Sequence, residues 1–189
     1  DINQSINPFS SSDLATIEKV FGGATSMTML KSYRSTYEIT EFTKRISPNI
    51  EVEAIERHGE EPQIIGCKNA EAEIKQIESL IKQFENSEYN SLGIICKTQT
   101  LADSLYQLLK VNFKLNLLNA LSVAFGSGVV ITTAHLAKGL EFDEVIIPFC
   151  TDKNYHTEPD KQILYVACTR GMHKLFITHT GKLSPLIAD

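Results

Sequence analysis

Residues 129–147, VVITTAHLAKGLEFDEVII, constrain the fold of this chain more than any other stretch. The runs 129–133 and 144–147 are short, largely apolar and rich in β-branched residues, which is typical of strands buried on both faces of a parallel sheet. The segment between them, HLAKGLEFD, concentrates polar and charged side chains in one connection. Ligands of open α/β sheets bind outside the carboxyl ends of the strands, so we expect binding or chemistry here.

The rest of the chain alternates between strand-like and helix-like patterns. The patterns predict strands at 26–30, 50–56, 63–67, 92–96 and 175–178, and helices at 14–21, 37–46, 71–84, 101–109 and 160–169. The clearest helix is 71–84, which places its apolar side chains on one face. The polar stretch 149–159 is predicted to be a mobile surface loop, and 110–128 receives no regular element. This alternation predicts a three-layer α/β fold with a mostly parallel sheet.

Composition excludes several classes of protein. The net charge of −5 argues against a free-standing nucleic-acid-binding domain, although a local DNA track remains compatible with it. No apolar run approaches the length of a membrane span, so we expect no membrane partner. The four cysteines have no metal-binding spacing, and the histidines form no ligand pair, so we assign no metal site. Cys96, Cys150 and Cys168 lie in apolar surroundings, as expected of buried thiols in a reducing cytoplasm.

Residues 132–147, TTAHLAKGLEFDEVII, resemble motif V of the UvrD/Rep-type superfamily 1 DNA helicases, T-x-H-x-x-K-G-L-E-F-[DP]-x-V. The matching residues are Thr133, His135, Lys138, Gly139, Leu140, Glu141, Phe142 and Val145. Residues 163–177 resemble motif VI, residues 33–36 (YRST) resemble motif IV, and residues 1–9 resemble the end of motif III. The resemblance implies the second, C-terminal RecA-like domain at 26–189, preceded at 1–25 by the tail of the first RecA-like domain.

The resemblance also implies a role for individual side chains. For the ATP site it implies base stacking by Tyr33, sensing of the terminal phosphate by the catalytic residues Gln4, Arg34 and Arg170, and nucleotide contacts at Gly139 and Glu141. For single-stranded DNA it implies contacts from Phe9, Thr133, His135 and Lys138. The chain departs from the family pattern at several positions: for example, Asn7 stands where Tyr is usual, Ser32 where Asn is usual, and Lys97 where Arg is usual.

One expected motif is absent from the sequence. No G-x-x-x-x-G-K-[ST] occurs, so this RecA-like domain lacks its own P-loop. The chain begins at Asp1 without a signal-peptide pattern, and we expect it to be part of a longer protein. The intact parent is then expected to be an ATP-dependent DNA helicase that uses ATP and Mg²⁺ held largely by a missing N-terminal RecA-like domain. This chain alone is expected to be inactive.

Alternatives from other classes remain open at this point. Only residues 110–128 stand where UvrD and Rep carry a large accessory domain, which favours the branch of helicase IV and the HelD proteins associated with RNA polymerase. The domain could therefore be a module that binds RNA polymerase or another partner, with ATP turnover secondary. The motifs do not separate these two functions. A small-molecule α/β enzyme is disfavoured because no catalytic dyad or glycine-rich fingerprint is present.

Overall fold

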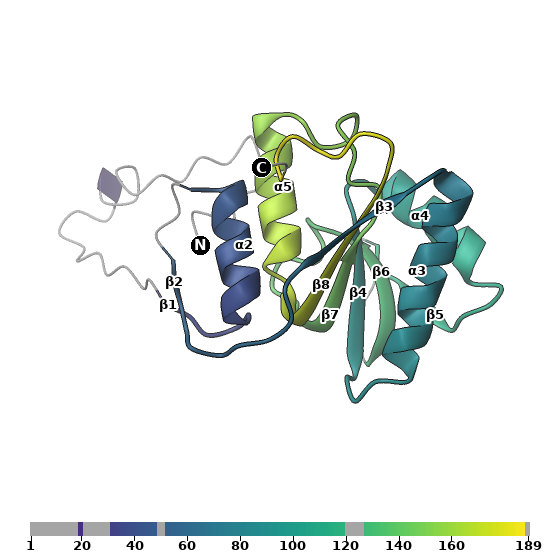
Figure 1. Ribbon diagram of the computed structural model, residues 1–189, viewed down its shortest axis with the longest axis horizontal. Coiled ribbons are helices and arrows are strands. Elements are labelled where there is room, and N and C mark those ends of the chain that lie inside the picture. Colours follow the sequence, from purple (N-terminus) through teal and green to yellow (C-terminus); the bar gives the residue numbers. More distant parts are fainter. Residues whose placement is uncertain (1–18, 21–30, 49–51, 120–126, 188–189) are drawn as a thin grey trace.

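A six-stranded, all-parallel sheet forms the centre of the described structure (Figure 1). The computed structural model describes residues 19–20, 31–48, 52–119 and 127–187. The strand order is β3-β8-β7-β4-β6-β5. The strands are β3 Gln63–Cys67, β4 Ser91–Cys96, β5 Leu115–Leu117, β6 Gly128–Thr133, β7 Phe142–Ile147 and β8 Gly171–Thr180. Strands β1 (Lys31–Ser32) and β2 (Glu53–Ala54) form a separate parallel pair.

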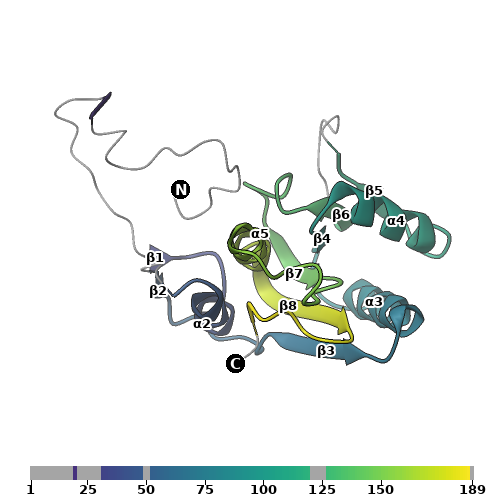
Figure 2. The same cartoon turned by 90° about the horizontal axis from the view of Figure 1, so that it is seen from above.

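Two pairs of helices cover the two faces of the sheet (Figure 2). Helices α2 (Tyr37–Ile46) and α5 (Glu158–Cys168) lie on one face, and α3 (Ala70–Glu85) and α4 (Gln99–Leu109) lie on the other. Each helix begins at a side chain that accepts a backbone N–H of the first turn, as N-caps do. These caps are Thr36, Asn69, Thr98 and Thr157. Local sequence therefore determines where all four helices start.

The core is divided into two apolar layers by the alternation of side chains along the strands. In β4, Ile94 packs in the layer under α3 and α4, whereas Ile95 packs in the layer under α2 and α5. Gly93 precedes them in β4, faces the same layer as Ile95 and lies against the ring of Phe142. A Cβ at Gly93 would lie 2.6 Å from a carbon of that ring, so only glycine fits without displacing it.

The predicted three-layer α/β fold with a mostly parallel sheet is confirmed. The predicted helices and strands within the described residues agree with the structure to within a few residues, except that β2 is short and β8 extends further in both directions. Strand β5 was not predicted. The strand predicted at 26–30 lies outside the described residues, as does most of the helix predicted at 14–21. Of the N-terminal unit 1–25, the structure describes only residues 19–20, so the predicted domain boundary stays a prediction.

The stretch 149–157 contains no helix or strand, as the predicted loop requires, but the prediction that it lies on the surface is wrong in part, and residues 158–159 belong to α5. Cys150 and Tyr155 are fully buried there, and Thr151 forms a bridge to Leu183. The Asn154 side chain donates to Phe149 O at 2.8 Å and closes the loop on itself. The polar composition of the loop concealed two side chains that anchor it in the core.

No helix in the part of the chain that the structure describes is long and apolar enough to cross a membrane. Cys96, Cys150 and Cys168 are buried, as predicted. Burial raises the pKa of the Cys96 and Cys150 thiols to about 12, so both remain protonated and unreactive at neutral pH.

Candidate functional site

A connector of eight residues, 134–141, joins the two ends of the sheet. Strand β6 ends at Thr133, which pairs with Cys96 at the carboxyl end of β4. Strand β7 begins at Phe142, and its pairing with β4 places it at the amino end. From Cys96 to Leu92, the partner of Glu144, is four positions, and Phe142 lies two residues before Glu144, so the start and the end of the connector are about 20 Å apart along the sheet. Ala134 and Ala137 of the connector are fully buried in the layer under α2 and α5.

Three charged side chains gather at the amino end of the sheet. Arg34 Nε lies 2.5 Å from Glu141 Oε1, although the two residues are 107 positions apart. Arg170 directly precedes β8, and its carbonyl accepts the backbone N–H of Phe142 at 3.0 Å. Burial lowers the pKa of Arg170 to about 10, and the nearby charge of Arg34 lowers it while Glu141 opposes the shift. Arg34, Glu141 and Arg170 therefore form one electrostatic cluster.

The Arg170 guanidinium is directed into its own domain. The residue is 1% exposed, and its Nε donates to Val166 O at 3.1 Å. Its Nη1 donates to Leu140 O at 3.3 Å, and its Nη2 donates to Thr169 Oγ1 at 3.2 Å. Leu140 lies in the connector, so Arg170 links the end of α5 to the segment that carries Glu141.

Tyr33 and Arg34 lie on the loop between β1 and α2. Tyr33 is 71% exposed, so one face of its ring is open for stacking. The pair between Arg34 and Glu141 is also partly exposed, with side chains 30% and 47% accessible. A pair exposed to this degree contributes about 1 kcal/mol or less, so another partner can displace it at low cost.

Gly139 and Lys138 occupy the exposed middle of the connector. Gly139 has φ of +93°, a left-handed conformation that disfavours other residues. No atom lies within 4 Å of the position that a Cβ would take, so backbone conformation and not space requires glycine here.

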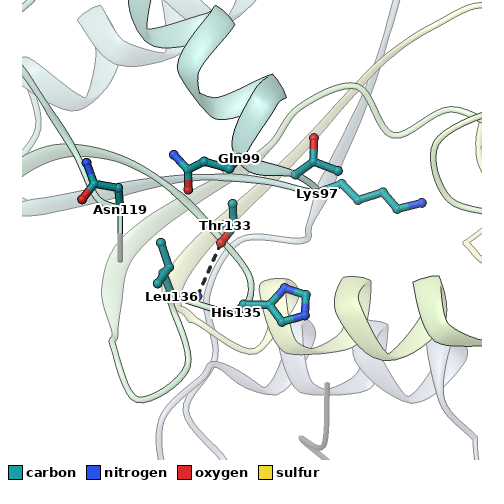
Figure 3. Close-up of a pocket in the computed structure, with 7 residues that line it drawn as sticks. Lys97, Gln99, Asn119, Thr133, His135 and Leu136 are labelled. Atoms are coloured by element: carbon teal, nitrogen blue, oxygen red, sulfur yellow. Dashed lines mark hydrogen bonds between the residues drawn. The ribbon is translucent and has the colours of Figure 1, made fainter. Parts of the chain in front are cut away.

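A pocket of about 650 Å³ lies at the opposite, carboxyl end of the sheet (Figure 3). Thr133 is nearly buried at the end of β6, and its Oγ1 accepts the backbone N–H of Leu136 at 3.5 Å. His135 is exposed beside it. The lining residues come from the ends of β4, β5 and β6 and the start of α4: Lys97, Thr98, Gln99, Asn119, Thr133, His135 and Leu136.

Lys97 contributes no free charge to this pocket. Its side chain extends away from Thr133 (Figure 3), and its Nζ lies 2.5 Å from Asp160 Oδ1 and also donates to Asn154 O. Burial would raise the pKa of Asp160, but hydrogen bonds from Lys97 and the backbone N–H groups of His156 and Thr157 lower it to about 2. The positive charge expected at this position is therefore neutralised inside the domain.

The structure brings the predicted residues together in two groups. Arg34, Glu141 and Arg170 meet at the amino end, and Thr133 and His135 meet in the pocket at the carboxyl end. The predicted residues Gln4 and Phe9 lie outside the described residues. Sequence reasoning missed the pocket residues Thr98, Gln99 and Asn119, although their place directly after β4 and β5 is a signal that could have found them. In the described residues no group of three His, Cys, Asp or Glu side chains could hold a metal ion.

Comparison with known proteins gives the family of this domain. Residues 103–182 match the family described as the UvrD-like helicase C-terminal domain. The solved C-terminal domain of a possible DNA helicase from Lactobacillus plantarum WCFS1 is 34% identical, with a TM-score of 0.71 over 83% of this chain and 92% of that domain. The chain belongs to the UvrD-like helicase C-terminal domain family.

The chain aligns with only about a tenth of the length of the curated relatives that it matches. A probable DNA helicase II homolog of Rickettsia conorii is 38% identical over 31% of this chain, and the DNA helicase II of Rickettsia typhi is 37% identical over the same share. The aligned part makes up 11% of each relative's length. Glu141 and Arg170 lie inside the region that matches the family, whereas Tyr33 and Arg34 precede it.

Proposed function

We propose that this domain supplies one half of an ATP site and part of a single-stranded DNA track to an ATP-dependent DNA helicase or translocase. The other half of the ATP site comes from an N-terminal RecA-like domain of the same protein. In this proposal Arg34 and Arg170 contact the terminal phosphate and Tyr33 stacks on the base. Glu141 and Gly139 lie against the nucleotide.

The observation that carries this proposal is the connector 134–141. It begins beside the pocket at the carboxyl end of the sheet, and it ends at Glu141 in the charged cluster at the amino end. Guanidinium groups form paired hydrogen bonds with phosphate oxygens, so Arg34 and Arg170 are suited to a triphosphate. A single short segment thus links the proposed nucleotide contact to the proposed DNA contact.

Each arginine binds phosphate by exchanging partners. The exposed Arg34–Glu141 pair is weak, so a phosphate oxygen can replace the Glu141 carboxylate at Arg34. Arg170 gives its donors to Val166, Leu140 and Thr169 and must exchange at least one of these bonds to reach a phosphate. Closure of the first domain onto this face would provide the phosphate that drives both exchanges.

The phosphate cradle and the metal ligands are assigned to the other domain. Mg²⁺ in such sites neutralises charge on the transferring phosphate. The described residues of this chain offer no suitable cluster of ligands, and the sequence contains no P-loop. This chain by itself should therefore release no phosphate from ATP, with or without single-stranded DNA.

The pocket supports the DNA half of the proposal. It offers hydroxyl and amide groups, which hydrogen-bond to DNA phosphates without carrying a full charge, and also the imidazole of His135. Because Lys97 is paired with Asp160, this pocket should add little to the salt dependence of DNA binding. Thr133 and His135 are the proposed contacts in the pocket, and the exposed Lys138 is the proposed charged contact beside it.

The test uses the full-length protein that carries this chain. Wild type should hydrolyse ATP faster with single-stranded DNA, and Arg34→Ala should abolish most of that turnover, whereas Arg45→Ala, an exposed arginine at the far end of α2, should not. Thr133→Val should raise the DNA concentration needed for half-maximal stimulation about 5-fold, the effect of one hydrogen bond. Thr132→Val, at the fully buried neighbouring position, is the matched control.

Two results would contradict the proposal. One is a full-length protein that hydrolyses no ATP under any of these conditions. The other is turnover that responds to RNA polymerase but not to DNA, which would favour the partner-binding module instead.

A further inference from the structure

We infer that Arg57 is a positioning residue for the proposed ATP site, because it fastens the backbone of Arg34 to the strand that follows Arg170. This inference rests on the proposed function for the role of Arg34. Arg57 belongs to none of the matched motifs and precedes the region 103–182 that matches the family.

One nitrogen of Arg57 makes the connection. Its Nη2 donates to Arg34 O and also to Met172 O, the latter at 3.1 Å. Met172 is the second residue of β8 and lies two positions after Arg170. The same nitrogen therefore joins the two segments that carry the two phosphate-sensing arginines.

The rest of the Arg34 loop lies along the start of β8. Ser35 Oγ donates to Gly171 O at 2.6 Å, and Thr36 N donates to Met172 O at 3.2 Å. Tyr37 N donates to Arg57 O at 2.8 Å. Among these bonds, the one from Arg57 Nη2 is made to Arg34 itself, so Arg57 acts closest to the guanidinium that must be held in place.

The backbone around Arg57 is itself fixed on the start of α2. The Glu38 carboxylate accepts His58 Nδ1 and Gly59 N, each at 2.8 Å. A Cβ at Gly59 would lie 2.7 Å from Thr36 Cγ2, which shows how closely residues 57–59 approach the loop. Arg57 therefore reaches Arg34 from a rigid base.

Loss of the Arg57 side chain should loosen Arg34 and leave the fold intact. The bonds from Ser35 and Thr36 to β8 remain, and the buried side chains of α2 do not depend on Arg57. Catalytic groups need placement within about 0.5 Å. A displacement of about 1 Å can lower turnover about 100-fold.

The first experiment measures ATP hydrolysis by the full-length protein. Arg57→Met keeps a long apolar stem and removes the donors, and it should lower kcat about 10- to 100-fold while KM for ATP changes less. Arg57→Lys should recover part of the loss, since an ammonium can donate to both carbonyls and Arg57 Nε has no partner among the described residues. Arg45→Met, the same replacement at the exposed arginine of α2, should leave kcat unchanged.

A double variant shows whether Arg57 acts through Arg34. In an Arg34→Ala background, Arg57→Met should cause no further loss of kcat, because the group that it positions is gone. Fully additive losses would overturn the inference. A lowered melting temperature with normal kcat per folded molecule would also overturn it, since that pattern belongs to a stabilising role only. If Arg57→Met fails to fold, Arg57→Gln takes its place in every comparison.

The second experiment uses the 189-residue chain and needs no ATP, so it separates this inference from the proposed function. The Nε–H of Arg34, which is bonded to Glu141, should give a ¹⁵N-correlated NMR signal that is lost in Arg34→Lys. In Arg57→Met the signal should shift or broaden, and in Arg45→Met it should stay. An unchanged signal in Arg57→Met would overturn the inference whatever the ATPase result. A changed signal beside an inactive wild-type full-length protein would support the positioning contact and count against the proposed function alone.

Discussion

Replacement of Arg170 separates a functional role from a stabilising one. Arg170 is the largest of the fully buried side chains in the described residues. Its surroundings destabilise the charge on balance, because burial and Arg34 lower its pKa from 12.5 to about 10 although Glu141 acts in the opposite direction. That shift corresponds to about 3 kcal/mol of penalty on the charged form at neutral pH, where the group is charged in both the folded and the unfolded state.

The hydrogen bonds of Arg170 offset this penalty only in part. Val166 O also accepts the Thr169 hydroxyl at 2.9 Å, so it keeps a hydrogen-bond partner when the guanidinium is removed. Leu140 O is the acceptor that would lose its bond from Arg170. An unsatisfied buried acceptor costs about 1–3 kcal/mol. Arg170→Met keeps the apolar stem, relieves the buried charge and loses these bonds, so its free energy of unfolding should stay within about 1–2 kcal/mol of wild type. Arg170→Ala adds a cavity and should lose about 3 kcal/mol or more.

Catalysis should respond differently. An arginine that stabilises the transferring phosphate contributes roughly 10³–10⁵ to kcat. Arg170→Met in the full-length protein should therefore collapse kcat with little change in melting temperature, and Arg170→Lys should restore little because an ammonium lacks the planar fork. Both quantities are measured on one preparation. Near-normal kcat per folded molecule in Arg170→Met would refute the reasoning and leave Arg170 as a structural link between α5 and the connector.

Three further predictions concern the stacking residue, the pocket wall and the core. In the full-length protein, Tyr33→Ala should weaken ATP binding by about 1–3 kcal/mol in equilibrium titrations, and Tyr33→Phe should be mild; equal affinities would make Tyr33 a surface residue. Because the folded pKa of Asp160 is lowered from 3.8 to about 2, its contribution of about 2 kcal/mol is complete above about pH 5 and is lost as the pH falls toward 2. Urea unfolding of the chain should thus show a stability gap to Asp160→Asn at pH 7 that closes near pH 2, and a gap independent of pH would exclude this cause. Gly93→Ala should cost about 1–3 kcal/mol by crowding the Phe142 ring, with partial recovery in the double variant with Phe142→Leu; wild-type stability of the single variant would contradict the tight contact.

The elements that sequence predicted well are those with a strong local pattern. Strands β4, β6 and β7 are buried on both faces and read as apolar runs, and α3 has a clear apolar stripe. Strand β5 was missed because it has only three residues and pairs with a single neighbour. The order of the strands in the sheet could not be predicted from local patterns either, because it depends on the path that each connection takes across the sheet.

The site shows the same division between local and tertiary information. The resemblance to the family motifs pointed to Arg34, Glu141 and Arg170 one at a time. The ion pair between Arg34 and Glu141 joins residues 107 positions apart, and no local pattern could indicate it. The same holds for Arg57, whose partners Arg34 and Met172 come together only in the folded domain.

The connector 134–141 is hardly longer than the distance that it spans, and this limits how independently its two ends can move. It must cover about 20 Å along the sheet and pass from one side of β4 to the other, a further 10 Å sideways at about 4.8 Å per strand. Nine Cα–Cα steps reach about 30 Å when fully extended. The connector is not fully extended, since Ala137 N donates to Thr133 O and Leu140 N donates to Ala137 O. The extended length that remains is close to the distance required, and the buried Ala134 and Ala137 hold the connector against the core.

This short length couples the two ends of the connector in the proposed function. A phosphate that draws Arg34 away from Glu141 frees Glu141, the last residue of the connector. Any shift of Glu141 must then change the turns that begin at Thr133. The structure therefore predicts that nucleotide state and DNA affinity change together, through the geometry of one segment and without a separate relay.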